Sequence, residues 1–285
     1  MPIEPPVASP TSLVEAYTLL ADADGWRPVA GGTDLMVQIT GEIGPPPERV
    51  LDIWRLDELR GISRDGEGAL VLGALTTYTD IRHSELVAQV LPALAEAAAT
   101  IGAAQIQNRG TIGGNVVNAS PAGDTLPVLL ATDAQIVLGS TSGERIVAAK
   151  DFWTGYRITE RRANELLLRI RIPMPPGRQV RFRKVGTRRA QAISKVVMAL
   201  SWRPDGGVWR DVRVALGSVA ATPIRAGDTE SALEGAAPRR ETADHAVAKI
   251  TSEIKPIDDV RSTAEYRRFV TGRILDRLLR DAGGW

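Results

Sequence analysis

The sequence contains no cysteine. A cysteine-ligated iron–sulfur cluster, a thiolate zinc site and a cysteine nucleophile all need a cysteine side chain, so this chain holds none of them. Disulfide bonds are excluded for the same reason, which agrees with a cytoplasmic location. The absence therefore removes several redox and hydrolytic classes at once.

Histidine is almost as scarce as cysteine. Only His83 and His245 are present, far apart in the chain and each without a neighbouring ligand motif. Because most transition-metal sites in proteins depend on histidine or cysteine ligands, we expect no metal centre held by this chain. Any redox chemistry would then depend on an organic cofactor.

Long apolar runs and an excess of one charge are also missing. No apolar run approaches the roughly 20 residues that cross a bilayer, and the N-terminal residues lack the basic and apolar regions of a secretory signal. The formal net charge is +1, which provides no general attraction to nucleic acid or to an anionic membrane. We expect neither a nucleic-acid partner nor a membrane span. The basic run RQVRFRKVGTRR at 178–189 permits an RNA-binding interpretation, but strand alternation predicts that its charges lie on one solvated face.

Three well-known site motifs are absent as well. No G-x-G-x-x-G follows a strand and opens a helix, and no G-x-x-x-x-G-K-[ST] occurs. Ser120 has no G-x-S-x-G elbow around it and no credible histidine base, which argues against a serine hydrolase. A dinucleotide bound by this chain would need a fold other than the Rossmann fold.

The N-terminal segment predicts a small β-α-β unit. Ser12 to Glu15 has the spacing of a capping box, and the helix that follows should end at Asp24-Gly25. A short strand is expected over Trp26 to Ala30, and a partner strand over Arg49 to Ile53.

The middle of the chain predicts a mixture of short strands and helices. A hairpin is expected around Arg64 to Gly68. The helices and strands that we expect after it are Thr77 to Ser84, Leu91 to Ile101 and Thr125 to Thr132 as helices, and Ala134 to Leu138 and Leu166 to Ile172 as strands.

The run Pro173 to Gly177 is the best linker candidate. Beyond it we expect three strands, Val180 to Val185, Ala192 to Trp202 and Val208 to Leu216, and a last helix that begins at a capping box, Ser262 to Glu265. The chain therefore predicts an α+β protein with a larger body over residues 1–175, in lobes of about 1–58 and 59–175, and a smaller domain over 176–285.

Two glycine pairs carry the signal for a ligand. They are Ala30-Gly31-Gly32-Thr33-Asp34 and Thr111-Ile112-Gly113-Gly114-Asn115. Successive backbone N–H groups in such turns form a concave nest for anions, and glycine lets a ligand approach the backbone closely. We interpret the stretch 102–124 around the second pair as an irregular functional loop. Thr33, Thr111, Asn115 and Ser120 would add neutral donors, and Asp34 and Asp124 would add acceptors.

At these two segments the sequence resembles the FAD-binding medium subunits of molybdenum hydroxylases, the xanthine dehydrogenase and carbon monoxide dehydrogenase group, whose FAD-binding domain has a fold of the vanillyl-alcohol oxidase type. The match to TIGGNVVNASPAGDTLPVLLATDA, Thr111 to Ala134, is long and specific. Pro28 to Leu35 resembles the family's first flavin loop. Lys184 to Ile193 and Tyr266-Arg267-Arg268 resemble parts of its C-terminal domain, so nearly the whole chain is covered.

The resemblance implies that residues 1–175 form an FAD-binding domain, and it implies which residues bind FAD without a covalent bond. They are Pro28, Val29, Ala30, Gly31, Gly32, Thr33, Asp34, Leu35, Ile101, Thr111, Ile112, Gly113, Gly114, Asn115, Ser120, Asp124, Leu167 and Lys184. Two positions depart from the family pattern: some members have asparagine where Gly32 stands, and Ile101 offers apolar surface but no aromatic ring. The resemblance names no catalytic residue, and Lys184 and Arg188 are expected to face the flavin or a partner subunit.

The resemblance also implies the function. FAD would accept electrons one at a time from [2Fe-2S] clusters in a small partner subunit, substrate would be oxidised at a molybdenum cofactor in a large partner subunit, and an external acceptor such as NAD, a quinone or dioxygen would take the electrons. The complex would be a heterotrimer or its dimer. Two alternatives stay open: a self-contained FAD-dependent oxidoreductase that acts on a small molecule, and a scaffold that has lost its flavin.

Overall fold

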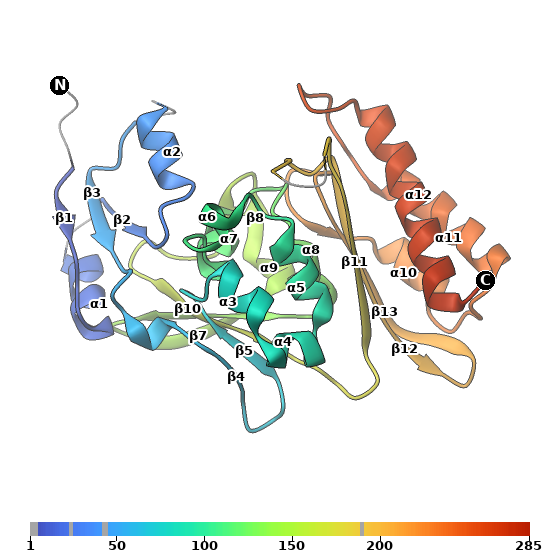
Figure 1. The fold of residues 1–285 in the computed structure, drawn as a ribbon, viewed down its shortest axis with the longest axis horizontal. Coiled ribbons are helices and arrows are strands. Elements are labelled where there is room, and N and C mark those ends of the chain that lie inside the picture. Colours follow the sequence, from blue (N-terminus) through green and yellow to red (C-terminus); the bar gives the residue numbers. More distant parts are fainter. Residues whose placement is uncertain (1–4, 23–24, 42–44, 189–190) are drawn as a thin grey trace.

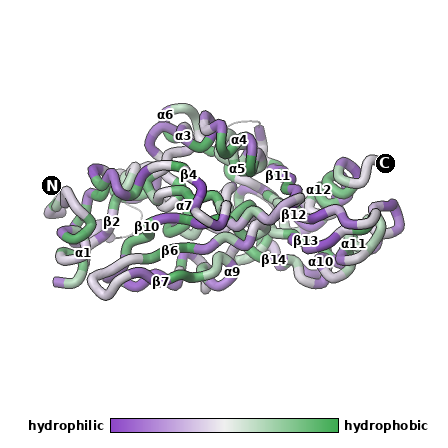
Figure 2. Tube along the Cα trace, turned by 90° about the horizontal axis from the view of Figure 1, so that it is seen from below, coloured by the Kyte–Doolittle hydropathy of each residue, from purple (hydrophilic) through white to green (hydrophobic). Residues whose placement is uncertain are grey.

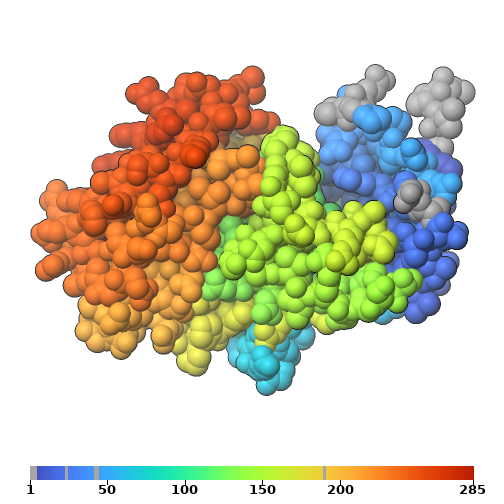
Figure 3. Space-filling model, turned by 180° about the vertical axis from the view of Figure 1, so that it is seen from behind, coloured from blue at the N-terminus to red at the C-terminus, as the bar shows by residue number. Residues whose placement is uncertain are grey.

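The computed structural model describes residues 5–22, 25–41, 45–188 and 191–285. An N-terminal lobe, a central α+β body and a C-terminal domain follow one another across the long axis of the molecule (Figures 1 and 3). Asp24 and Arg189, which we expected at a helix end and in the basic run, lie outside the described residues.

The N-terminal lobe is the β-α-β unit that the sequence predicts. A three-stranded parallel sheet has the order β1-β3-β2, with β1 at Val7–Ala8, β2 at Trp26–Val29 and β3 at Arg49–Asp52. Helix α1, Leu13–Asp22, buries Ala16 and Leu20 against it, and α2, Leu35–Thr40, follows the first glycine turn.

The predicted capping boxes are only partly correct. At the start of α1 the Glu15 amide donates to Ser12 Oγ (3.2 Å), but the Glu15 carboxylate accepts from the Thr11 amide (2.8 Å) rather than from Ser12. Before the last helix the capping residue is Thr263, whose Oγ1 accepts from the Tyr266 amide (3.2 Å), so the box predicted from Ser262 is wrong by one position. In both cases the sequence motif locates the helix start and misses the exact bonding partner.

The central body is a five-stranded antiparallel sheet with the order β4-β5-β10-β6-β7. Its strands are β4 Ile62–Arg64, β5 Leu70–Gly73, β6 Gln135–Ser140, β7 Gly143–Ala148 and β10 Leu166–Ile172, and β8 Trp153–Gly155 pairs with β9 Ile158–Thr159 beside it. The helices are α3 Tyr78–His83, α4 Glu85–Val90, α5 Pro92–Ala99, α6 Ala104–Gln107, α7 Ile112–Asn118, α8 Leu126–Ala131 and α9 Ala149–Phe152, with a 3-10 turn at Asp57–Leu59. The predicted hairpin, the two predicted helices before residue 102 and the strand over Leu166–Ile172 are confirmed.

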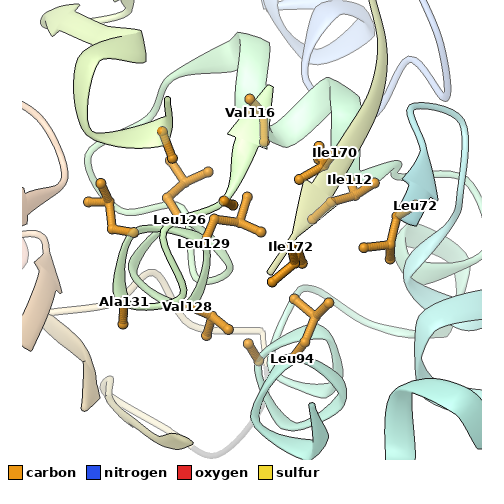
Figure 4. Packing of buried hydrophobic residues seen from close by; sticks show 14 of the residues in the cluster. Leu72, Leu94, Ile112, Val116, Leu126, Val128, Leu129, Ala131, Ile170 and Ile172 are labelled. Atoms are coloured by element: carbon orange, nitrogen blue, oxygen red, sulfur yellow. The ribbon is translucent and has the colours of Figure 1, made fainter. Parts of the chain in front are cut away.

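The prediction of an irregular loop over 102–124 is wrong where α6 and α7 interrupt it. Thr111 caps α7 through its Oγ1, and Ala119 ends this helix in the left-handed conformation (φ 51°). Val116 and Ile112 of α7 point into the same core as Leu126 and Leu129 of α8, Leu94 of α5 and Ile170 of β10 (Figure 4). Along most elements, hydrophobic and hydrophilic residues alternate in short stretches, as expected of elements with one buried face (Figure 2).

The C-terminal domain is a four-stranded antiparallel sheet covered by three helices. The three predicted strands are β11 Gln179–Val185, β12 Val196–Asp205 and β13 Val208–Gly217, and a short fourth strand that we did not predict, β14 Ile224–Arg225, pairs with β13. Helices α10 Gly227–Leu233, α11 Arg240–Glu253 and α12 Ala264–Gly283 pack on one face.

The other face of that sheet packs on the central body. Val180, Phe182, Val197, Ala199 and Ala215 belong to the same buried cluster as the residues of α5 and α8. Figure 1 shows β11 to β13 lying between α5 and α8 on one side and α10 to α12 on the other. The sheet is therefore buried on both faces, and one of those faces completes the core of the central body.

Polar contacts join the same two parts. Asp133, at the end of α8 and in the left-handed conformation (φ 51°), forms ion pairs with Arg213 (3.2 Å) and Arg225 (3.0 Å) of the C-terminal sheet. The Ser218 amide donates to the Pro121 carbonyl (2.7 Å). Within the described residues no helix is both long and apolar enough to cross a membrane.

Candidate functional site

A cleft runs between the N-terminal lobe and the central body. It holds about 970 Å³ of atom-free space, part of which is open solvent. Its walls include the predicted site residues Pro28, Val29, Ala30, Gly31, Gly32, Thr33, Asp34, Leu35, Thr111, Gly113, Gly114, Asn115 and Leu167. The structure thus brings together two segments about 80 residues apart in the sequence, as we predicted.

The first glycine turn presents free backbone amides to the cleft, and we call the segment Gly31–Asp34 the amide cradle. Gly32 has φ +75°, a conformation that strongly favours glycine, and in the described part of the chain the amides of Gly32, Thr33 and Asp34 have no acceptor. Three successive free N–H groups at the wall of a cleft form the donor set that an anionic or oxygen-rich ligand needs.

Gly31 serves a different purpose, which is to let two backbones touch. A Cβ built on Gly31 would lie 1.6 Å from the carbonyl oxygen of Arg109. The Arg109 guanidinium in turn lies 3.9 Å from the ring centroid of Trp54, and Arg60 lies 4.5 Å from the same centroid and donates to the Trp54 carbonyl (2.6 Å). The contact between Gly31 and the Arg109 carbonyl holds the first glycine turn close to the start of the second glycine turn.

The second glycine turn does not have the free amides that we expected. Its N–H groups are occupied within the protein: Ile112 donates to the Thr76 carbonyl, Gly113 to the Ala74 carbonyl, Gly114 to Thr111 Oγ1 and Asn115 to the Thr111 carbonyl. The prediction of a second backbone nest is therefore wrong, because these residues form the first turn of α7. A Cβ on Gly113 would meet Ala74 O at 2.6 Å, so this glycine is required by packing.

Side chains supply the donors on this wall instead. The Asn115 carbonyl oxygen accepts from Thr125 Oγ1 (2.6 Å), which leaves its amide nitrogen without an acceptor in the described chain. Thr111 Oγ1 accepts from Gly114 and retains its own hydroxyl hydrogen. Both side chains line the cleft.

Two arginines in the cleft wall, Arg27 and Arg161, were not predicted from the sequence. Arg161 donates through Nη1 to the carbonyls of Arg162 (2.9 Å) and Glu165 (2.7 Å), and within the described residues no carboxylate forms an ion pair with it. Burial, and then the like charge of Arg27, lower the pKa of the Arg161 guanidinium. Two cations on one wall of a cleft without a paired carboxylate favour an anionic ligand.

Glu165, which also lines the cleft, has its carboxylate engaged by another arginine. Arg145 binds it at both oxygens (2.6 and 2.8 Å), and its side chain is almost fully buried. Burial raises the pKa of the Glu165 carboxyl, but the Arg145 guanidinium and the Arg162 amide outweigh this and leave it lowered. Glu165 therefore stays ionised and paired with Arg145, and it offsets the charge of Arg161 only in part.

Asp124 and Lys184 lie outside that wall and form a buried ion pair. Lys184 Nζ lies 2.6 Å from Asp124 Oδ2 and also donates to the Thr100 carbonyl (3.0 Å), while the hydroxyls of Ser194 and Thr100 donate to the same carboxylate. Burial raises the pKa of Asp124, and Lys184 acts against that rise. Lys184 shares the inner face of β11 with Val180 and Phe182, so our expectation that every charge of the basic run lies on one solvated face is wrong for this residue.

The remaining predicted residues, Ile101, Ile112 and Ser120, are not part of the cleft wall. Ile101 packs against the central core at its edge, and the side chain of Ile112 is fully buried, so Ile112 presents no side chain to the cleft. Ser120 Oγ accepts from the Ala122 amide (3.3 Å) next to Asp124. No group of three or more histidine, aspartate or glutamate side chains in the described chain has the arrangement of a metal site.

These features fit FAD in their chemistry. Free amides, neutral hydroxyl and amide donors and guanidinium groups without a paired carboxylate suit a diphosphate and its riboses, and the apolar stretches Pro28–Ala30 and Leu166–Leu167 suit an aromatic ring system. The fit rests on the cradle at Gly31–Asp34, which a Cβ on Gly31 would destroy.

Comparison with known proteins finds relatives that cover nearly the whole chain. Residues 3–175 match the family model of the FAD binding domain in molybdopterin dehydrogenase, and residues 181–282 match that of the CO dehydrogenase flavoprotein C-terminal domain. The glyceraldehyde dehydrogenase medium chain of Sulfolobus acidocaldarius is 36% identical over 91% of each chain, and the carbon monoxide dehydrogenase medium chain of Hydrogenophaga pseudoflava is 33% identical over 96% of this chain and 95% of the relative. A solved structure of carbon monoxide dehydrogenase from Hydrogenophaga pseudoflava superposes with a TM-score of 0.92 over 97% of this chain and 96% of that chain, at 33% identity.

Proposed function

This chain belongs to the FAD-binding medium subunits of the molybdenum hydroxylase family, and from that premise we propose that it relays electrons between partner subunits and an external acceptor. FAD, when bound, supplies the redox chemistry: it can exchange electrons singly or in pairs. The single observation that supports the proposal best is the cleft with its amide cradle at Gly31–Asp34, which fits a dinucleotide.

The chain's own residues bind and orient the cofactor. We propose that the cradle and the side chains of Thr111 and Asn115 hold the diphosphate, with Arg161 and Arg27 adding positive charge. Asp124, Lys184 and Ile101 would contact the isoalloxazine end, together with Leu167, and Ser120 would support Asp124. The Asp124–Lys184 pair is nearly excluded from water, so in that position it would present a fixed dipole to the flavin ring.

We propose that the partners are a large subunit with the molybdenum cofactor and a small subunit with [2Fe-2S] clusters, in a heterotrimer or its dimer in the cytoplasm. NAD, a quinone or dioxygen would be the acceptor. The division into residues 1–175 and 176–285, with lobes near 1–58 and 59–175, is also a proposal. The boundary near residue 176 is supported by a buried cluster between the C-terminal sheet and its helices, which contains only residues beyond that boundary.

Reconstitution tests the relay. The purified chain should be yellow, should release FAD on denaturation and should oxidise no substrate until iron–sulfur and molybdenum subunits are added. Substrate turnover by the isolated chain would instead support a self-contained FAD-dependent oxidoreductase. A colourless chain that does not take up added FAD would refute both and leave a scaffold.

A further inference from the structure

Tyr78, the first residue of α3, has a side chain that is held rigidly beside the cleft. The preceding residue, Thr77, caps the helix through a reciprocal box with Asp80, whose Oδ2 accepts from the Thr77 amide (2.9 Å) and hydroxyl (2.7 Å). The Tyr78 amide donates to the Gly110 carbonyl (3.2 Å), and the ring packs so tightly on Gly110 that a Cβ there would lie 2.9 Å from it. One side of the ring is therefore packed against Gly110.

The hydroxyl of this ring makes no hydrogen bond to any residue that the structure describes. Only 3% of Tyr78 is exposed, but its oxygen is not among the enclosed side-chain atoms that lack a partner in the described chain, so it reaches the free space of the cleft that Tyr78 lines. A phenol hydroxyl that is open to the cleft can donate a hydrogen bond to what the cleft binds.

Two carboxylates of the proposed cofactor site act on the Tyr78 phenol. Burial, then the charge of Asp124 and then that of Asp34 raise the pKa of the Tyr78 phenol, so the group is protonated throughout the physiological range and is available as a donor. Asp34 belongs to the amide cradle, whereas Asp124 belongs to the pair with Lys184 at the expected isoalloxazine end. Tyr78 is therefore close enough to both carboxylates to feel their charge.

We propose that the Tyr78 hydroxyl donates a hydrogen bond to an oxygen of the ribityl-phosphate segment of bound FAD, the part that links the isoalloxazine ring to the diphosphate. Tyr78 is thus a binding and positioning residue and takes no part in electron transfer itself. The inference rests on the proposed function, since it requires that the cleft binds FAD.

The test is the variant Tyr78→Phe in the full chain, stripped of flavin and titrated with FAD while the flavin fluorescence is recorded. Loss of one hydrogen bond should raise the Kd of FAD about two- to tenfold. The Tm of the flavin-free variant should stay within about 1 °C of the wild type, because no protein–protein hydrogen bond is lost. In competition experiments the affinity of the variant for FMN, which contains the ribityl-phosphate segment, should fall by the same factor. Its affinity for ADP, which lacks that segment, should not change.

Tyr17→Phe provides the matched control. Its hydroxyl is directed at Gly139 of β6, away from the cleft, so its removal should leave the Kd of FAD unchanged. Equal FAD affinity of Tyr78→Phe and the wild type would overturn the inference, and so would a loss seen with ADP and not with FMN. A wild-type chain that binds no FAD at all would refute the proposed function instead, so the two failures are distinguishable.

Discussion

Replacing Gly31 by alanine is the sharpest perturbation that the structure offers. The added Cβ would lie 1.6 Å from the Arg109 carbonyl oxygen and 2.4 Å from its carbonyl carbon, whereas real Cβ atoms essentially never come within 3.0 Å of another heavy atom. The two segments would have to separate by about 1.4 Å at this point, the difference between 3.0 and 1.6 Å. Both colliding atoms are backbone, so no side-chain rotation relieves the contact.

The separation should weaken both folding and ligand binding. Forced expansion of a packed contact costs about 1–3 kcal/mol of the free energy of unfolding. Arg109 precedes Gly110 and the second turn, and its guanidinium is held over Trp54, so displacing the Arg109 carbonyl widens the cleft between its two walls. We expect the Kd of FAD to rise at least about tenfold, which corresponds to roughly 1.4 kcal/mol.

Two measurements and one control check this prediction. Urea unfolding of the flavin-free chain gives the stability change, and fluorescence titration gives the Kd of FAD. Gly66→Ala is the matched control: a Cβ on Gly66 would have no heavy atom within 4 Å and the φ of this residue is not positive, so the variant should match the wild type in both assays. A Gly31→Ala variant with the stability and FAD affinity of the wild type would refute the reasoning.

Three further predictions concern charged groups. Asp124→Asn and Lys184→Met should each destabilise the flavin-free chain by about 3–5 kcal/mol because each leaves one buried charge unpaired, while the double variant should recover much of the loss; additive losses in urea unfolding would contradict this. The pKa of Glu165 is lowered in the folded chain, so its ion pair stabilises the protein above the ordinary glutamate pKa of about 4.3 and is lost as the pH falls through the folded value; the Tm difference between the wild type and Glu165→Gln should therefore shrink below about pH 4, and a constant difference would exclude this cause. Arg161→Met should raise the Kd of FAD severalfold and make it less dependent on salt, and an unchanged salt dependence would show that Arg161 serves only its own loop.

Local patterns in the sequence predict much of the fold. The strand over Leu166–Ile172 and the hairpin around Arg64–Gly68 are confirmed because alternation and turn residues report on neighbours close in sequence. The helix α7 was missed because glycine and asparagine are poor helix formers, and here the Thr111 cap and burial of Val116 outweigh that preference. The short strand β14 carries no signal of its own, since it forms only by pairing with β13.

The candidate site was predictable where it depends on the chain's local conformation. Glycine pairs indicate the turns, but they do not show whether the amides are free, and only the first pair keeps them free. Tyr78 and Arg161 carry no local signal. In the described chain the Tyr78 hydroxyl has no hydrogen-bond acceptor and Arg161 has no paired carboxylate, and these absences can be recognised only in the folded structure. Likewise the Ser194 and Thr100 donors to Asp124 come from distant parts of the chain.

The C-terminal sheet has a consequence for dividing the gene. Phe182 and Val197 are inserted on one side of it and Met198 and Leu200 on the other, so a cut in the linker near Gly177 would leave a bare apolar face on both products. Neither fragment should fold when produced alone. Produced together, the two fragments should associate by complementation. The two parts of the chain should then unfold in one cooperative transition and not as independent domains.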